Sequence, residues 1–415
     1  MIFRTSAKAP RFCAALLASL MVAACAGRPH DILVPSAQTA PGTSRVDLFV
    51  ATTRSPDKAE PGNMFGGERA AEPSYAAISV SIPPDQLRKI GEVQWPHSSG
   101  DPSREMVTVR ADILDHDKAL KELHAAMRTS ARRQVLVFVH GYNNGFDEAV
   151  FRFAQIVHDS GTSATPVLFT WPSAANVLAY NYDRESATYS RDALETLLQG
   201  LCQDPTVADV TILAHSMGNW VAIEALRQMA IRHGRVPGKI STVMLAAPDV
   251  DIDVFRNDER TIGPRSPKFI LLVSQDDRAL AWSRRLAGKT RLGAINPNDE
   301  PYKSELQAAG VSVIDLTDVK ANDMMAHSKF ANSPEVVRLI GQRLAAGQTI
   351  EDEDVAIGGR IELATEGLAG AVGAAAGVAV STPIATVDPD TRAELGDEIK
   401  EVRDNAALAT GDPSN

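Results

Sequence analysis

Cysteine is scarce in this sequence, with three residues in 415, and no pair has the C-x-x-C spacing of a zinc or redox site. Histidine-rich tracts and basic runs are also missing, so neither a metal centre nor a nucleic-acid partner is expected. Positive charge is in deficit, because the formal net charge is −10 at pH 7. What is present is a globular composition, with 44% hydrophobic and 23% charged residues. Such a chain can bury a core without metal or disulfide cross-links.

The first 25 residues predict an export signal. Arg4, Lys8 and Arg11 give a positive start with no acidic residue among them. An apolar stretch over residues 12–24 follows, too short to span a bilayer comfortably. It ends in Val22-Ala23-Ala24-Cys25, which resembles the bacterial lipobox. The resemblance implies a signal peptide over residues 1–24 and lipidation of Cys25; the alternative is an ordinary secretory peptide with an unrelated cysteine.

Lipidation would anchor the mature chain to a membrane, since buried acyl chains contribute about 0.8 kcal/mol per CH₂. By resemblance to known lipoproteins, Ala26 after the cysteine favours the outer membrane of the bacterial cell envelope, with the domain facing the periplasm or the cell surface. Loss of residues 1–24 moves the formal net charge from −10 to −13. Cys202 then remains as a single thiol, which excludes an internal disulfide and predicts a small buried apolar residue.

Composition divides the rest of the chain into three parts. Residues 25–45 are rich in Ala, Pro, Ser and Thr and predict a flexible tether. Residues 46–345 predict one domain, in which residues 46–130 form a β-rich portion packed on the main sheet. From residue 346 to residue 415 an acidic run and an Ala/Gly/Val-rich segment predict a low-complexity, largely disordered tail.

Short apolar runs alternate with amphipathic stretches throughout residues 134–345. Runs without strict alternation are typical of parallel strands buried on both faces. Strand–helix alternation predicts an α/β fold with a doubly wound, mostly parallel sheet and helices on both faces. The predicted strands cover residues 46–52, 76–82, 106–113, 134–139, 166–170, 209–213, 239–245, 269–273 and 311–316. The predicted helices cover residues 146–159, 189–201, 219–232 and 334–345.

The segment from Val210 to Trp220 carries the strongest chemical signal. An apolar strand leads into Ala214-His215-Ser216-Met217-Gly218, and a helical pattern follows. A serine nucleophile needs such a sharp turn between strand and helix, with small residues two positions before and after it. Ala214 and Gly218 meet that requirement, although glycine is the commoner residue at the first position. The alternative is a serine that caps an ordinary helix.

A second strand ends in His140-Gly141-Tyr142-Asn143 before another helical pattern. Acyl transfer needs backbone donors aimed at the oxyanion, one after the nucleophile and one from this loop. The first is the Met217 N–H. We expect the second to be the Tyr142 N–H, with the Asn143 N–H as the alternative. His140 is expected to shape the loop rather than to act as a base.

The general base is expected last in chain order, as in the Ser…Asp…His order of this fold. His327 meets this expectation, because it follows the last predicted strand and no histidine comes after it. The orienting acid is expected after the preceding strand, where Asp276 and Asp277 are adjacent. Asp277 fits better, with Leu280 packing below it; Asp276 and Asp249 remain alternatives.

Taken together, the lipobox, Val-Phe-Val-His-Gly-Tyr-Asn-Asn (residues 137–144), Phe-Thr-Trp-Pro-Ser (169–173), Ala-His-Ser-Met-Gly-Asn (214–219) and Asp-Asp-Arg-Ala-Leu (276–280) resemble a bacterial α/β-hydrolase lipoprotein family of largely uncharacterised function. That family is grouped with the esterase and lipase superfamily. The resemblance covers about residues 46–345 and implies the fold and the catalytic machinery.

The sequence therefore predicts a serine hydrolase that cleaves small or lipid-derived carboxylic esters through Ser216, His327 and Asp277. The predicted mechanism requires no metal and no cofactor, and the membrane is expected as a partner through Cys25. Tyr142, Trp171, Trp220 and Tyr180 are expected to line an acyl pocket or to belong to the core. Two other functions stay open: an amidase, peptidase or acyltransferase with the same triad, and a non-enzymatic lipoprotein that uses the fold as a binding scaffold.

Overall fold

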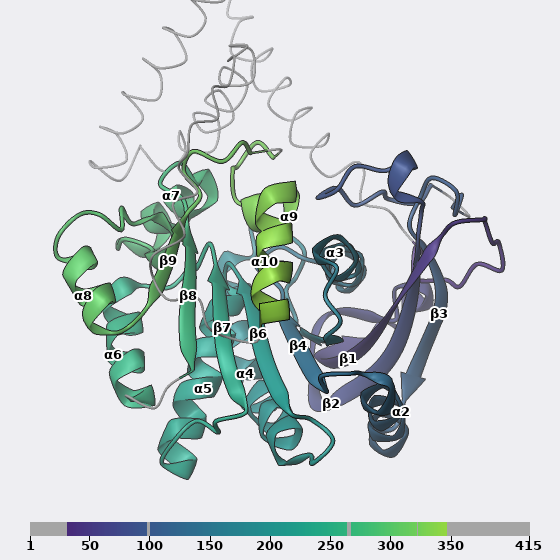
Figure 1. Cartoon of the computed structure of the whole chain (residues 1–415), viewed down its shortest axis with the longest axis horizontal. Helices are drawn as coiled ribbons and strands as arrows, with labels where there is room; N and C mark the ends of the chain where they lie inside the picture. The colour runs from purple at the N-terminus through teal and green to yellow at the C-terminus, as the bar shows by residue number, and fades with distance from the viewer. Residues whose placement is uncertain (1–30, 98–99, 264–266, 322, 347–415) are drawn as a thin grey trace, which may run out of the picture.

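A computed structural model describes residues 31–97, 100–263, 267–321 and 323–346. In these ranges one nine-stranded sheet has the order β3-β2-β1-β5-β4-β6-β7-β8-β9, with helices on both faces (Figure 1). The strands are β1 (Ser44–Pro56), β2 (Phe65–Ile82), β3 (Val107–Leu114), β4 (Gln134–Val139), β5 (Thr165–Thr170), β6 (Asp209–His215), β7 (Ile240–Ala246), β8 (Lys268–Val273) and β9 (Ser312–Asp315).

Helices connect most of the parallel strands. The α-helices are α2 (His116–Thr129), α3 (Phe146–Ser160), α4 (Tyr180–Gln203), α5 (Gly218–His233), α6 (Ile252–Ile262), α7 (Arg278–Ala287), α8 (Tyr302–Ala308), α9 (Lys329–Asn332) and α10 (Pro334–Ala346). The 3₁₀ turns are η1 (Pro61–Asn63), η2 (Asp85–Leu87) and η3 (Leu292–Ala294). No helix in the described ranges has both the length and the hydropathy that crossing a bilayer requires.

Strand direction divides the sheet into two parts. In the spatial order β1-β5-β4-β6-β7-β8-β9, every neighbouring pair of strands is parallel. Strands β2 and β3 extend the sheet on the other side of β1 by antiparallel pairing. The carboxyl ends of parallel strands meet at one edge of a sheet, so the turns that follow β4, β5, β6, β7 and β8 lie together. The predicted doubly wound sheet and its attached N-terminal β-rich portion are therefore confirmed.

Alternate residues of each central strand supply two separate cores. In β4 all six residues are buried, with Val135, Val137 and Val139 on one face and Leu136 and Phe138 on the other. The first face packs against α2, α4, α5 and α6, and the second packs against α3, α9 and α10. Figure 1 shows α3 and α10 in front of the sheet and α4 and α5 behind it. Burial on both faces explains why these strands read as continuous apolar runs.

Side-chain caps fix where several helices begin. Asp115 accepts a hydrogen bond from Lys118 N at the start of α2, and Asp251 accepts one from Asp253 N at the start of α6. Each such cap contributes about 1 kcal/mol. Helix α4 begins at Tyr180, earlier than the expected residue 189, because its first turns pack against the loop that follows β5.

The N-terminal boundary differs from the prediction. Within the expected tether over residues 25–45, Ile32 and Leu33 are buried in the same core cluster as side chains of β1 and β2. The Thr108 hydroxyl donates to the Ile32 carbonyl, and Ser36 N donates to the Thr108 carbonyl. The signal peptide, Cys25 and the tail after residue 346 lie outside the described residues. Cys202 is half-buried in α4, where burial raises the pKa of its thiol to about 11.

Two helical glycines, Gly341 of α10 and Gly200 of α4, give opposite predictions for substitution by alanine. A Cβ on Gly341 would lie 1.9 Å from the Ser160 carbonyl oxygen, whereas a Cβ on Gly200 would meet open space. Gly341→Ala should therefore lower the free energy of unfolding by about 1–3 kcal/mol. Gly200→Ala should raise it by roughly 0.5–1 kcal/mol, because alanine favours the helix. Urea unfolding measures both values, and a gain in Gly341→Ala would contradict this packing.

Candidate active site

Ser216 occupies a strained turn between β6 and α5. Its φ is +53°, in the left-handed region that costs a serine about 1–3 kcal/mol. The residue is buried, with 4% of its surface exposed, and Gly218 begins the helix two positions later. The turn confirms the local structure that the sequence predicts around Ser216, with an apolar strand before it and a helix after it.

Two glycines allow the turn after β6 to touch the loop after β4. A Cβ on Gly218 would lie 2.2 Å from the His140 carbonyl oxygen. A Cβ on Gly141 would lie 2.7 Å from Ser216 Cβ and 2.9 Å from His215 Nδ1. Contacts this short exclude any side chain, so the backbones of the two turns are in direct contact. The contact brings the loop after β4 within reach of chemistry at Ser216.

Hydrogen bonds hold the backbone of the turn in this conformation. Ser216 N donates to the Ala246 carbonyl, and the Ser216 carbonyl accepts from Asp249 N. The buried side chain of Asn219 donates to both of these carbonyls, at 2.8 Å and 3.0 Å. Asn219 thus links the turn to the end of β7. The Ser216 hydroxyl makes no hydrogen bond with another described residue, so it is available to a substrate or to a base.

His327 lies in the loop between β9 and α9 and pairs with Asp277. Its Nδ1 is 2.7 Å from Asp277 Oδ2, and the Asp277 side chain is fully buried. Asp277 caps α7 by accepting from Leu280 N at 3.0 Å, which fixes the direction of the carboxylate. The Asp277 and Leu280 arrangement that the sequence predicts is therefore present.

The imidazole of His327 lies beside the turn that carries Ser216. The ring centroids of His215 and His327 are 4.8 Å apart, and His215 Nε2 is 3.3 Å from the His327 carbonyl oxygen. His215 immediately precedes Ser216. The three residues predicted as a triad thus come from three separate loops to one edge of the sheet.

Burial and charge act in opposite directions on His327. Burial lowers the pKa of its imidazole, but the charge and the hydrogen bond of Asp277 outweigh burial, and the pKa is raised above the usual value. For His215, burial and the neighbouring His327 both lower the pKa well below the usual value. These interactions stabilise the protonated form of the His327 imidazole and the neutral form of His215.

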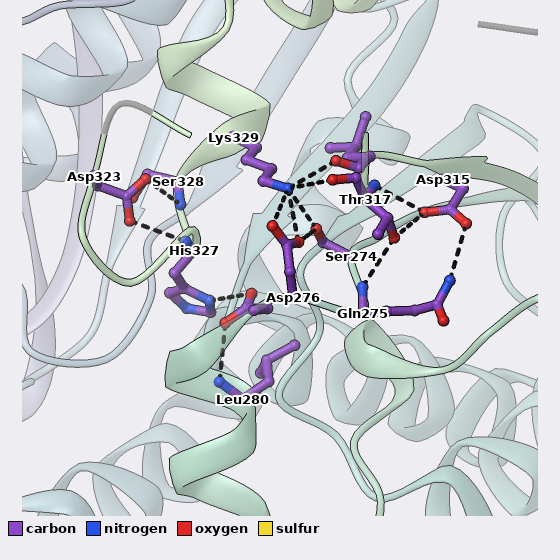
Figure 2. A network of polar contacts seen from close by, with 12 residues as sticks. Ser274, Gln275, Asp276, Leu280, Asp315, Thr317, Asp323, His327, Ser328 and Lys329 are labelled. Atoms are coloured by element: carbon purple, nitrogen blue, oxygen red, sulfur yellow. Dashed lines mark hydrogen bonds and ion pairs between the residues drawn. The ribbon is translucent and has the colours of Figure 1, made fainter. Parts of the chain in front are cut away.

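The two alternative acids are engaged elsewhere. Asp276 binds Lys329 Nζ at 2.7 Å and points away from the imidazole (Figure 2). Asp249 is buried beside Arg291, 3.2 Å from its Nε, and accepts from the hydroxyls of Ser283 and Tyr180. Among the three carboxylates that the sequence left open, the structure joins Asp277 to His327.

Of the two candidate oxyanion donors in the loop after β4, one already makes a hydrogen bond within the protein. Asn143 N donates to Asp183 Oδ2 at 3.2 Å, which occupies the alternative oxyanion donor. The N–H groups of Tyr142 and Met217 donate to no other described residue. The geometry therefore favours Tyr142 over Asn143 as the partner of Met217.

His140 ties this loop to Trp171, the residue that follows β5. Trp171 N donates to His140 Nε2 at 3.1 Å, and the indole N–H of Trp171 donates to the His140 carbonyl. Burial and the nearby Arg54 lower the pKa of His140 to about 3, so the ring stays neutral. Its Nε2 accepts from Trp171 N and its Nδ1 is 2.9 Å from the Gly141 carbonyl oxygen, so both ring nitrogens are engaged within the protein, as expected for a structural residue.

Sequence reasoning missed a buried pair of charges that holds the loop. Arg54 of β1 donates to the carbonyls of Gly66, Ser173 and Asn144 at 2.8–3.0 Å. Asp183 of α4 accepts from Ser173 Oγ, Ala174 N and Asn143 N. Burial lowers the pKa of Arg54 to about 10 and raises the pKa of Asp183. Nothing in the local sequence of Arg54 signals this role, because its partners are distant in the chain.

Aromatic side chains gather next to the candidate oxyanion loop. Tyr142, Tyr180 and Trp282 contact one another with ring centroids 5.5–6.1 Å apart. Trp282 was not expected, since it lies in α7, which the sequence did not predict. Trp171 is fully buried and belongs to the core, whereas Trp220 is half-buried and contacts Arg184.

Comparison with known proteins agrees with the fold. The family model described as "Alpha/beta hydrolase of unknown function (DUF900)" matches residues 115–343, just over half of the chain. An uncharacterized protein of Nostoc sp. (strain PCC 7120 / SAG 25.82 / UTEX 2576) is 25% identical over 147 residues, which are 29% of this chain. The match spans 38% of the length of that relative.

Solved esterase structures are more distant. The esterase Pf2001 of Pyrococcus furiosus is 12% identical with a TM-score of 0.30, over 52% of this chain and 84% of its own. The rice cell wall degrading esterase LipA of Xanthomonas oryzae is 12% identical with a TM-score of 0.31, over 75% of this chain and 100% of its own. Similarity at this level carries no argument about activity.

Proposed function

We propose that this chain, which belongs to the family of α/β-hydrolases of unknown function, is a serine hydrolase that cleaves carboxylic esters through an acyl-enzyme. The observation that carries the proposal is the hydrogen bond between His327 and Asp277 beside the strained turn of Ser216. A binding scaffold has no need of a strained serine, a buried carboxylate and an imidazole that meet from three loops.

In the first half-reaction Ser216 Oγ attacks the ester carbonyl while His327 Nε2 takes the hydroxyl proton. The oxyanion that forms accepts hydrogen bonds from Met217 N and Tyr142 N. Loss of one such donor costs roughly 100- to 1,000-fold in rate. The His327 cation then gives its proton to the leaving alcohol, and an ester of Ser216 remains.

The second half-reaction repeats these steps with water. His327 Nε2 takes a proton from water, which attacks the acyl carbon in the same oxyanion hole. Ser216 leaves and recovers its proton, and the acid is released. Asp277 stays ionised throughout and stabilises the imidazolium that forms twice in each cycle, in agreement with the raised pKa of His327.

Apolar side chains on two loops favour an ester with an apolar acyl or alcohol group. Leu178 is 84% exposed in the loop after β5, and Met324 is 67% exposed in the loop that carries His327. The Tyr142 hydroxyl donates to the Val177 carbonyl, which connects the first loop to the aromatic cluster of Tyr142, Tyr180 and Trp282. The substrate class proposed is therefore a small or lipid-derived ester.

A lipid anchor on Cys25 is part of the same proposal, with the domain held at the bacterial cell envelope. The support is the lipobox-like sequence that ends in Cys25. An anchored hydrolase with an acidic mature chain would meet apolar esters at the membrane without electrostatic attraction to anionic lipid.

Ser216→Ala tests the nucleophile. The purified wild type should react with a fluorophosphonate probe and hydrolyse a series of nitrophenyl esters. Ser216→Ala should lose the labelling, and its hydrolysis should fall to roughly a few thousandfold over water, the residual rate expected from the oxyanion hole and binding alone. The chain-length series reports acyl preference, and parallel assays with anilides and acceptor alcohols detect an amidase or an acyltransferase. A folded wild type that neither labels nor turns over esters would favour a binding scaffold.

Asp277→Asn tests the acid through the rate and its pH dependence. Turnover should fall about 10⁴-fold, because the imidazolium loses its counter-charge. A general base works when neutral, so wild-type kcat/KM should rise with pH through a pKa above the ordinary value of about 6.5. The residual activity of Asp277→Asn should rise with pH through a lower pKa than that of wild type, since the charge and the hydrogen bond of Asp277 no longer oppose burial. An equal loss in Asp249→Asn would contradict the assignment.

Cys25→Ala tests the anchor in a bacterial host. The variant should leave the membrane fraction and lose incorporation of labelled fatty acid, whereas Cys202→Ala should behave as wild type. If Cys25→Ala remains in the membrane fraction, the lipobox interpretation is wrong.

A further inference from the structure

Lys329, the first residue of α9, carries a buried charge close to the site. Its side chain is 2% exposed, and its Nζ lies 2.7–3.0 Å from five oxygen atoms (Figure 2). These are both carboxylate oxygens of Asp276, the Ser274 hydroxyl and the carbonyls of Leu316 and Thr317. A buried ammonium is costly unless acceptors surround it, and here they do.

The ion pair of Lys329 repeats the pairing of His327 on the same two chain segments. Asp276 and Asp277 are adjacent after β8, and they bind Lys329 and His327 respectively. The two bonds cross-link the turn after β8 to the loop after β9 at neighbouring positions. A shift of one segment along the other would therefore lengthen both bonds together.

Lys329 also binds the turn that directly follows β9, through the carbonyls of Leu316 and Thr317. Gln275 N donates to the Thr317 hydroxyl, which itself donates to Asp315 Oδ1 at the end of β9. The ammonium lies between this turn and the turn after β8, and it bonds to both (Figure 2). Both turns continue strands of the rigid sheet, so Lys329 ties the start of α9 to fixed points.

Backbone bonds hold the rest of the loop that carries His327. Asp323 Oδ2 accepts from His327 N at 2.9 Å, and Arg278 N donates to the Met325 carbonyl at 3.0 Å. Asp323 Oδ1 also accepts from Ser328 N at 3.4 Å, directly after His327. Lys329, two residues after His327, adds the side-chain bonds that tie this loop to the turns after β8 and β9.

We propose that Lys329, through its ion pair with Asp276, is a positioning residue that sets the distance between His327 and Asp277. The inference rests on the proposed function, in which that bond orients the general base. Stability alone does not require the pair, since Asp276 is half exposed and buried ion pairs are often replaced by apolar residues without loss. A displacement of about 1 Å at a catalytic group can cost roughly 100-fold in rate.

Kinetics of Lys329→Met, Asp276→Asn and the double variant test the proposal on the full chain. Each single variant should lower kcat for a nitrophenyl ester by roughly 10- to 100-fold with little change in KM. The double variant should be no slower than Lys329→Met, because both changes break one pair. Arg232→Met is the matched control. It breaks the ion pair between Arg232, at the end of α5 that is remote from Ser216, and the buried Glu195 of α4. The control should keep wild-type kcat.

A second readout needs no substrate. The Nδ1 proton of His327, bonded to Asp277, should give a far-downfield proton resonance in NMR spectra, assigned by its loss in His327→Gln. The resonance should disappear or move upfield in folded Lys329→Met and Asp276→Asn and should remain in Arg232→Met. If Lys329→Met does not fold, the test uses Asp276→Asn. The Asp276 side chain is half exposed, and in that variant the Lys329 amine keeps its bonds to Ser274, Leu316 and Thr317.

The outcomes separate this inference from the proposed function. Unchanged kcat and an unchanged resonance in both variants would overturn the positioning role, while Ser216-dependent turnover would stand. An equal loss in Arg232→Met would also overturn it, since general destabilisation would then explain the effect. A wild type without turnover whose resonance is lost in Lys329→Met would refute the hydrolase and keep the positioning role.

Discussion

The site depends on a contact between two backbones. The loop after β4 and the turn after β6 touch at Gly141 and Gly218, where any side chain would overlap a carbonyl or Ser216 itself. Only adjacent parallel strands that end at the same level allow this approach, and β4 and β6 pair in register from Gln134 to Val139. The contact places Gly141, the residue before Tyr142, against the strained Ser216. The two turns that carry the candidate oxyanion donors are therefore joined through their glycines.

The base side of the site is built differently, from charges on loops. Asp277 and Asp276 follow β8 and bind His327 and Lys329, which follow β9. These two side-chain contacts join the turns after β8 and β9, as the contact at Gly141 and Gly218 joins the turns after β4 and β6. A third buried charge, Arg54 from the N-terminal β-rich portion, donates to the Ser173 and Asn144 carbonyls around the candidate oxyanion loop. The N-terminal strands thus support the candidate site as well as extend the sheet.

The sequence was informative where the physics is local. Apolar runs identified the parallel strands, and the residues around Ser216 identified the turn, because strand, turn and helix are contiguous there. Asp277 could be preferred over Asp276 from the position of Leu280 alone. Arg54, Asp183 and Lys329 could not be found in this way, since each binds groups that are distant in the chain and become neighbours only in the folded sheet. Ile32 and Leu33 were missed for a related reason, because their apolar run is too short to show the hydrophobic periodicity of a strand or a helix.

The central claim is that Ser216, His327 and Asp277 act as one unit, and the additivity of their losses tests it most directly. Turnover of a nitrophenyl ester would be measured for Ser216→Ala, His327→Gln, Asp277→Asn and the triple variant. The losses caused by mutating catalytic residues that act as a unit are strongly non-additive. If the three residues act as one unit, the triple variant should be no slower than Ser216→Ala. Losses that multiply across the three positions would contradict it, because the residues would then act independently.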